Sequence, residues 1–204
     1  MPSTPEVVPP PAVVTPAVVE AAALLRVLYD PVSYYPPWQH GARLLGPRQL
    51  SSLNAWLIQR EALPAYAVPV AAERALSLRL IAGWDRLPQV ARLLACAKQR
   101  RRLAGSRLYL AQPPYVHAFL RMPFVPATTE ASFTTDADLL QWGGRYLLHG
   151  LQARVPPWLR ARAALQFAGV QWADGATASV PDPFDLTCFW SAWNHAAYLS
   201  RPPA

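Results

Sequence analysis

Apolar residues recur at helical spacing along most of this chain, and the stretch Gly83 to Gly105 shows the pattern most clearly. Its apolar positions lie three or four residues apart and therefore share one face of a helix. They are Leu87, Val90, Leu94 and Ala97. Pro88 suits a first helical turn and Gly105 a left-handed helix end. The pattern predicts one long helix, around which we expect the fold to be organised.

The last turns of this predicted helix are basic. Four cations follow its apolar positions: Lys98, Arg100, Arg101 and Arg102. Cations near a helix C-terminus complement the negative end of the helix dipole by about 0.3 to 1 kcal/mol each. Arg101 continues the apolar stripe, so we expect the basic end to leave the core and meet solvent or a partner.

Helical periodicity or helix-start residues also mark most of the remaining chain. The segments are 17–28, 47–61, 71–84, 136–152, 158–168 and 183–199, with a shorter one at 114–120. Residues 107–112 alternate like a strand but are too few to decide between strand and helix. We therefore predict an all-α fold, a compact irregular bundle of six or seven helices joined by proline-rich loops.

Local signals predict particular contacts between these helices. Segments 71–84 and 83–105 follow each other after a short break, so we expect an antiparallel hairpin. The rigid aromatic segment 34–38, Tyr-Tyr-Pro-Pro-Trp, should pack against the helices rather than bind a ligand. Asp182 and Pro183 should start the last helix, as its cap and first-turn residue.

The helix predicted at 136–152 carries two unusual signals. Thr135 and Asp138 have the spacing of a capping box. Gly143 and Gly144 each cost about 1 kcal/mol relative to alanine in a helix, which suggests that a neighbouring backbone or ring comes close there. The polar residues of this helix, Gln141 among them, are expected to face outward.

Composition indicates one folded domain behind a tail. Residues 1–16 contain six prolines among valines and threonines, which favours extended polyproline conformations. With 52% hydrophobic and 15% charged residues, the rest is too apolar for a disordered protein. We expect a tail at 1–16 and a single helical domain at 17–204, with a loop at about 169–180.

The charge balance restricts the possible partners. The formal net charge is +7, and Lys98 is the only lysine among 19 basic residues. Arginine binds carboxylates and phosphates bidentately, so acidic protein surfaces and nucleic acids are both candidate partners, although a genomic base bias would also enrich arginine. Two cysteines make no disulfide framework, and neither a signal peptide nor a run of about 18 to 20 apolar residues is evident. We expect a cytoplasmic protein without membrane insertion.

No pattern of catalytic, metal-binding or cofactor-binding residues emerges. The four histidines lie far apart in the sequence: His40, His117, His149 and His195. Cys188 and His195 share a helical face, but seven residues separate them by about 10.5 Å along the axis, too far for a catalytic dyad. No phosphate loop, dinucleotide fingerprint or serine elbow occurs. We therefore expect no enzyme, no cofactor and no small-molecule substrate.

Two surfaces are candidates for partner binding. The first is the basic helix end, Lys98 with Arg100, Arg101 and Arg102, facing an acidic patch of a protein. The second is the aromatic stripe of the last helix, Phe189, Trp190 and Trp193, since aromatic residues are enriched at binding hot spots. This stripe could equally close the protein's own core. The alternative function is a nucleic-acid-binding helical protein that uses the basic end.

Several segments resemble the SctK family (YscK/PscK-like) of bacterial type III secretion systems. The sequence Leu28-Tyr29-Asp30-Pro31-Val32-Ser33-Tyr34 is similar to the N-terminal part of these proteins. The order of LSLRLIAG, VARLLACAKQRRRLA and GRYLLHGL before a Pro-Trp pair is similar as well, so that the resemblance covers about residues 26–168.

This resemblance implies a non-enzymatic, all-helical adaptor of the sorting platform beneath the injectisome. Its partners would be the cytoplasmic domain of the inner-membrane ring protein and the cytoplasmic-ring protein. It would lie in the cytoplasm and reach the inner membrane only through these partners.

Overall fold

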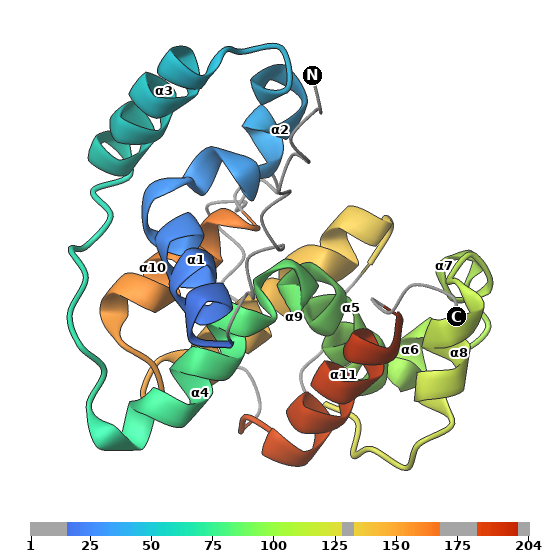
Figure 1. Cartoon of the computed structure of the whole chain (residues 1–204). Helices are drawn as coiled ribbons and strands as arrows, with labels where there is room; N and C mark the ends of the chain where they lie inside the picture. The colour runs from blue at the N-terminus through green and yellow to red at the C-terminus, as the bar shows by residue number, and fades with distance from the viewer. Residues whose placement is uncertain (1–15, 128–132, 168–182, 200–204) are drawn as a thin grey trace, which may run out of the picture.

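The computed structural model describes residues 16–127, 133–167 and 183–199, and every regular element within these ranges is helical (Figure 1). The all-α prediction is therefore confirmed. The described helices are α1 (Pro16–Tyr29), η1 (Pro31–Ser33), α2 (Pro36–Ala42), α3 (Pro47–Arg60), α4 (Ala71–Ala82), η2 (Trp84–Arg86), α5 (Leu87–Lys98), α6 (Arg100–Leu103), α7 (Arg107–Leu110), α8 (Pro114–Leu120), α9 (Asp136–Leu151), α10 (Pro157–Leu165) and α11 (Leu186–Leu199).

Eleven α-helices in the described residues exceed the six or seven expected, because the predicted long helix is divided into α5 and α6, and short helices form from the end of the aromatic segment (α2) and in the ambiguous segment 107–112 (α7). The 23 prolines of the chain are compatible with this fold because many of them start helices. Besides α1, which begins at Pro16, five described α-helices have proline at their first or second position, where its missing N–H leaves no bond unmade. These helices are α2, α3, α5, α8 and α10.

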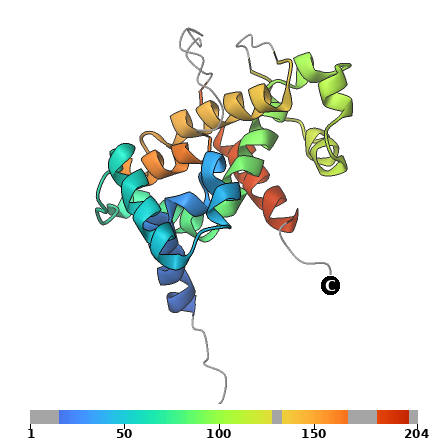
Figure 2. The same ribbon diagram turned by 90° about the horizontal axis from the view of Figure 1, so that it is seen from above.

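Helix α5 forms the centre of the molecule, as the sequence predicted. Helix α9 packs along it, and α11 and α8 cover further sides (Figures 1 and 2). The burial extends well beyond the predicted stripe, since Ala91, Leu93, Ala95 and Cys96 are also inaccessible to solvent. A helix that is apolar on nearly all sides belongs in the interior, which is where α5 lies.

The two adjacent glycines of α9 allow this close packing. A methyl group at Gly143 would overlap the backbone carbonyl of Ala91 in α5, and one at Gly144 would lie 2.8 Å from the ring of Phe167. The expectation that a backbone or a ring comes close is confirmed at both positions. The capping box of Thr135 and Asp138 is confirmed as well.

The predicted outward direction of Gln141 is wrong. Its side chain is buried. The outward assignment assumed that α9 has one solvent face along its length, but neighbouring Tyr146 and Leu139 are buried too. The buried part of α9 is therefore wider than the polar residues of its sequence suggest.

The single long helix predicted from Gly83 to Gly105 is interrupted twice. The η2 turn precedes α5, and the helix breaks again at Gln99 before α6. In an unbroken helix the carbonyl of Lys98 would accept from Arg102, but Ala127 N–H donates to that carbonyl at 2.6 Å and Arg102 N–H donates to Gln99 at 3.0 Å. A contact distant in sequence thus replaces the helical bond. Gly105 does adopt the expected left-handed conformation, with φ of 79°.

The predicted hairpin of α4 and α5 does not form. Helix α4 packs along α1, whereas α5 packs along α9. The connection Trp84–Arg86 is a 3-10 turn that runs directly into α5, so the chain bends between the two helices instead of reversing. Gly83 at this bend gives room to Trp193, whose ring carbon Cζ2 lies 2.5 Å from where a methyl group would be.

The aromatic segment after α1 packs inward as expected. Tyr34 and Tyr35 are buried. The Tyr34 hydroxyl donates to the Val27 carbonyl at 2.8 Å, and its ring meets Trp84 edge-on at 5.3 Å between centroids. The segment therefore ties η1 and α2 to α1 and to the bend before α5.

Between α3 and α4 the chain crosses one side of the molecule without regular structure (Figure 1). Two side chains of α10 donate hydrogen bonds to backbone carbonyl groups of this connection. Trp158 Nε1 donates to Ala67 at 2.8 Å, and Arg162 donates to Pro64 at 2.8 Å. These bonds join the N-terminal helices to α10.

Helix α11 starts three residues later than predicted. The carboxylate of Asp185 accepts from the backbone N–H of Cys188 at 2.9 Å, so Asp185 is the capping residue. The predicted cap Asp182, the predicted tail up to residue 15 and the predicted loop at 169–180 lie outside the described residues.

Candidate interaction surfaces

The positive charge of the chain is concentrated between residues 86 and 129. This segment carries eight basic residues and no acidic one, whereas the other eleven basic residues are balanced by all twelve acidic residues. Within the described residues, Arg92 forms an ion pair with Asp136 at 2.6 Å and Lys98 one with Asp185 at 2.7 Å. The segment gives one end of the molecule a positive field.

We call residues 99–127, which contain α6, α7 and α8, the basic lobe. It lies at one end of the molecule in both views, opposite α2 and α3 (Figures 1 and 2). Arg100, Arg101 and Arg102 are exposed on it. The guanidinium of Arg100 donates a hydrogen bond to the Met122 carbonyl at 3.4 Å. Three of the four predicted surface cations therefore lie on the surface.

The fourth, Lys98, points inward. Its side chain is only 5% exposed, and its ammonium group donates to Asp185 Oδ2 at 2.7 Å and to the Val125 carbonyl at 3.0 Å. Burial alone would raise the pKa of Asp185, but the hydrogen bonds from Lys98 and from the Cys188 N–H lower it below its ordinary value. Lys98 thus joins α5 to the start of α11 and does not belong to the surface.

The aromatic stripe of α11 is divided between core and surface. Phe189 and Trp193 are buried, at 0% and 6% exposure, and contribute to the common apolar core. Trp190 is half-buried, and the guanidinium of Arg79 lies 5.1 Å from its ring centroid. This burial supports the core interpretation for Phe189 and Trp193.

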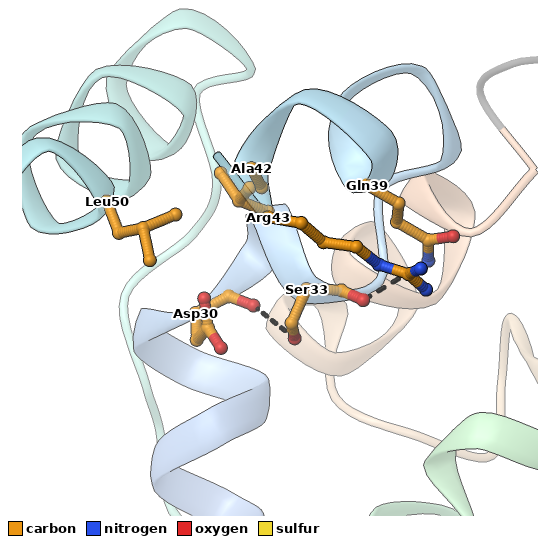
Figure 3. A pocket seen from close by; sticks show the side chains of 7 residues that line it. Asp30, Ser33, Gln39, Ala42, Arg43 and Leu50 are labelled. Carbon is orange, nitrogen blue, oxygen red and sulfur yellow. Dashed lines mark hydrogen bonds between the residues drawn. The ribbon is translucent and has the colours of Figure 1, made fainter. Parts of the chain in front are cut away.

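A groove of about 410 Å³ lies where η1, α2 and the start of α3 meet (Figure 3). Asp30 and Ser33 line one part, and the long side chain of Arg43 extends across it toward Gln39 (Figure 3). Gln39 Nε2 donates to the Ser33 carbonyl at 3.2 Å, which braces the wall. Leu50 supplies an apolar side.

Sequence reasoning did not identify this groove, because it depends on how α2 and α3 close on η1. A signal was present in the segment that carries the family resemblance, since Asp30, Val32 and Ser33 from that segment line the groove. The side chain of the buried Asn54 in α3 holds that segment in place. Its Oδ1 accepts from Val32 N–H at 3.0 Å, and its Nδ2 donates to the Asp30 carboxylate at 2.9 Å.

The structure also places the residues that could carry chemistry. Within the described residues, no group of three or more His, Cys, Asp or Glu side chains could hold a metal ion. Burial raises the pKa of both thiols, Cys96 and Cys188, to about 12. His195 lies in the core region with Nε2 2.9 Å from the Tyr115 carbonyl. None of the helices in the described ranges is long and apolar enough to span a bilayer.

The described residues define an all-helical protein whose excess positive charge is concentrated at one end. Comparison with known families agrees with the sequence resemblance. Residues 24–198 match the family model described as bacterial type III secretion apparatus protein (OrgA_MxiK), so the chain belongs to this family. The match confirms the SctK resemblance and extends it through α11. Neither a curated protein nor a solved structure matches the chain.

Proposed function

We propose that this protein is a non-enzymatic adaptor of the sorting platform of a type III secretion system. It links the cytoplasmic domain of the inner-membrane ring protein to the cytoplasmic-ring protein, and it reaches the membrane from the cytoplasm through these partners. Membership in a secretion-apparatus family supports an assembly role. The resemblance to SctK supports the choice of partners.

The observation that carries this proposal is the separation of two unlike surfaces. The basic lobe lies at one end of the molecule and helices α2 and α3 at the other (Figures 1 and 2). Residues of α2 and α3 line the groove. A molecule that joins two proteins needs surfaces far enough apart for both to bind at once. Helix α5 packs between α9 and α11 in the core, and α6 of the basic lobe follows it along the chain.

The chemistry of the basic lobe favours an acidic protein surface. Arg100, Arg101 and Arg102 are exposed, and each offers a planar fork of donors that matches a carboxylate. Charge complementarity of this kind speeds association and excludes partners of like charge. The helix α6 presents the three side chains from a single short turn.

The test is a charge reversal with a matched control. The double variant Arg100→Glu with Arg102→Glu should abolish binding of one of the two purified partners while its circular dichroism melt stays unchanged. The control reverses two exposed arginines elsewhere, Arg48→Glu with Arg74→Glu, and changes the net charge equally. Loss of binding in the control alone, or in neither variant, would contradict the proposed role of the lobe.

Nucleic acid is the second candidate partner, because the segment 86–129 contains no acidic residue to repel phosphates. Binding through phosphate contacts weakens steeply as salt rises. A mobility shift with this salt dependence, lost when Arg100, Arg101 and Arg102 become glutamine, would favour this function over the adaptor role of the lobe.

A further inference from the structure

A second positively charged feature lies outside the basic lobe, where the end of α4, the η2 turn and α11 meet. A pocket of about 370 Å³ is present there. Its lining residues are Arg79, Ala82, Gly83, Arg86, Trp193 and Asn194. Two arginines, one asparagine and one tryptophan thus border the same small space, and none of the described residues that line it is acidic.

The charges of this pocket are not compensated within the described residues. Neither Arg79 nor Arg86 forms an ion pair there. The nearest acidic residue in sequence, Asp85, is already bound by Arg26, whose two terminal nitrogens lie 2.7 and 2.9 Å from its carboxylate oxygens. The charge of Asp85 is therefore compensated by Arg26 of α1, and the two arginines of the pocket keep their positive charge.

The walls of the pocket are fixed by the core. Gly83 is buried against the ring of Trp193, so the bend before α5 and the middle of α11 are held together. Arg79 is oriented by its stacking on Trp190, with 5.1 Å from the guanidinium carbon to the ring centroid. A pre-oriented arginine loses less entropy when it binds a carboxylate than a fully mobile one does.

We propose that this pocket is a receptor for an acidic side chain of a partner protein. A glutamate or aspartate carboxylate binds the forks of Arg79 and Arg86 and accepts from the amide of Asn194. The adjoining residue of the partner packs on Ala82, which lines the pocket and is exposed. The pocket thus selects a partner that presents a carboxylate, whether or not this partner is one of the ring proteins named above.

The first test uses a small probe and the full chain. The probe is a capped peptide that carries glutamate beside leucine, and its control carries glutamine instead. The indole N–H resonance of Trp193, followed by nuclear magnetic resonance, should shift saturably with the glutamate peptide only. Equal shifts with both peptides, or no shift with either, would overturn the proposal.

Variants assign the shift to the pocket. Arg79→Gln with Arg86→Gln should remove it, and Arg48→Gln with Arg74→Gln should retain it at equal net charge. Arg79→Lys with Arg86→Lys should weaken binding by roughly tenfold, because lysine keeps the charge but lacks the bidentate fork. Unchanged affinity in the lysine variant would mean that only a diffuse field attracts the peptide, and the proposed receptor would be wrong.

Two further measurements distinguish an acidic side chain of a partner from other possible ligands of the pocket. If inorganic phosphate at equal concentration shifts Trp193 as strongly as the peptide does, the pocket binds small oxyanions and the acidic side chain is excluded as its specific ligand. A shift that grows with the concentration of the chain alone would assign the pocket to a second copy. Failure of the ring proteins to bind would contradict the proposed adaptor function without changing the peptide result.

Discussion

The ammonium nitrogen of Lys98 lies 2.7 Å from Oδ2 of Asp185, at a lysine side chain that is only 5% exposed. This pair joins the last turn of α5 to the first turn of α11, across 87 residues of sequence. The other carboxylate oxygen of Asp185 caps α11 through the Cys188 N–H. One aspartate therefore serves the tertiary contact and the helix start together.

Replacing Lys98 with methionine should destabilise the protein by about 3 kcal/mol, because it leaves the carboxylate of Asp185 partly buried and without its counter-ion. Urea unfolding measures this loss. Combining Lys98→Met with Asp185→Asn should restore part of the stability, since asparagine keeps an oxygen that can accept from Cys188. An unchanged urea midpoint in Lys98→Met would show that the pair contributes nothing to folding.

Acid should weaken the start of α9. Hydrogen bonds from the Thr134 hydroxyl and from the backbone N–H groups of Thr134 and Thr135 lower the pKa of Asp138 from 3.8 to about 2. Folding therefore favours the ionised carboxylate, and the stabilisation is complete above the unfolded pKa and lost as the pH falls through the folded pKa. Melting temperatures of the wild type and Asp138→Asn should differ at pH 7 and converge near pH 2. A constant difference across this range would argue against the assignment.

Gly143 is predicted to be intolerant of a single methyl group. Gly143→Ala places Cβ into the carbonyl of Ala91 and forces α9 away from α5, which should cost about 3 kcal/mol or more. The matched control is Gly41→Ala in α2, where nothing lies within 4 Å of the new methyl. That change should stabilise by about 0.5 to 1 kcal/mol, because alanine is the better helix former. Equal effects of the two variants in chemical unfolding would refute the close approach of α9 and α5.

Helix α11 is expected to act mainly in the core. Phe189→Ala should cost about 3 to 5 kcal/mol, as for other fully buried aromatic residues. Leu186→Ala, on the same helix but 42% exposed, should change stability by no more than about 0.5 kcal/mol. If Phe189→Ala instead left stability intact and removed partner binding, the stripe would be an interface.

Local signals in the sequence predicted most of the helices and their starts. The first-turn prolines Pro47 and Pro88, the capping box at Thr135 and the left-handed Gly105 each depend on neighbouring residues, which is why they were correct. The glycines of α9 predicted a close neighbour because a helix interior has few other uses for them. Which neighbour it is, Ala91 or any other residue, depends on packing that local patterns do not contain.

The errors have tertiary causes. The break at Gln99 results from the Ala127 N–H, which lies 29 positions after Lys98 and takes over its carbonyl. The predicted hairpin of α4 and α5 does not form, because a helical turn at Trp84–Arg86 bends the chain instead of reversing it. Lys98 was placed on the surface from its charge, although the apolar residues that precede it, Leu93 to Ala97, are buried on all sides of the helix.

The candidate surfaces were only partly accessible to sequence reasoning. A run of arginines is visible in the sequence, and three of them are indeed exposed at α6. The groove at Asp30 and Arg43, and the pocket at Arg79 and Arg86, each combine residues from separate helices. Such combinations arise only when the helices assemble.

The central claim is that this chain joins two proteins at the same time. The most direct measurement is analytical ultracentrifugation of the purified chain with the cytoplasmic domain of the inner-membrane ring protein and the cytoplasmic-ring protein. The account predicts a ternary complex that forms only when the chain is present and is lost with Arg100→Glu and Arg102→Glu. Two binary complexes that displace each other would contradict it.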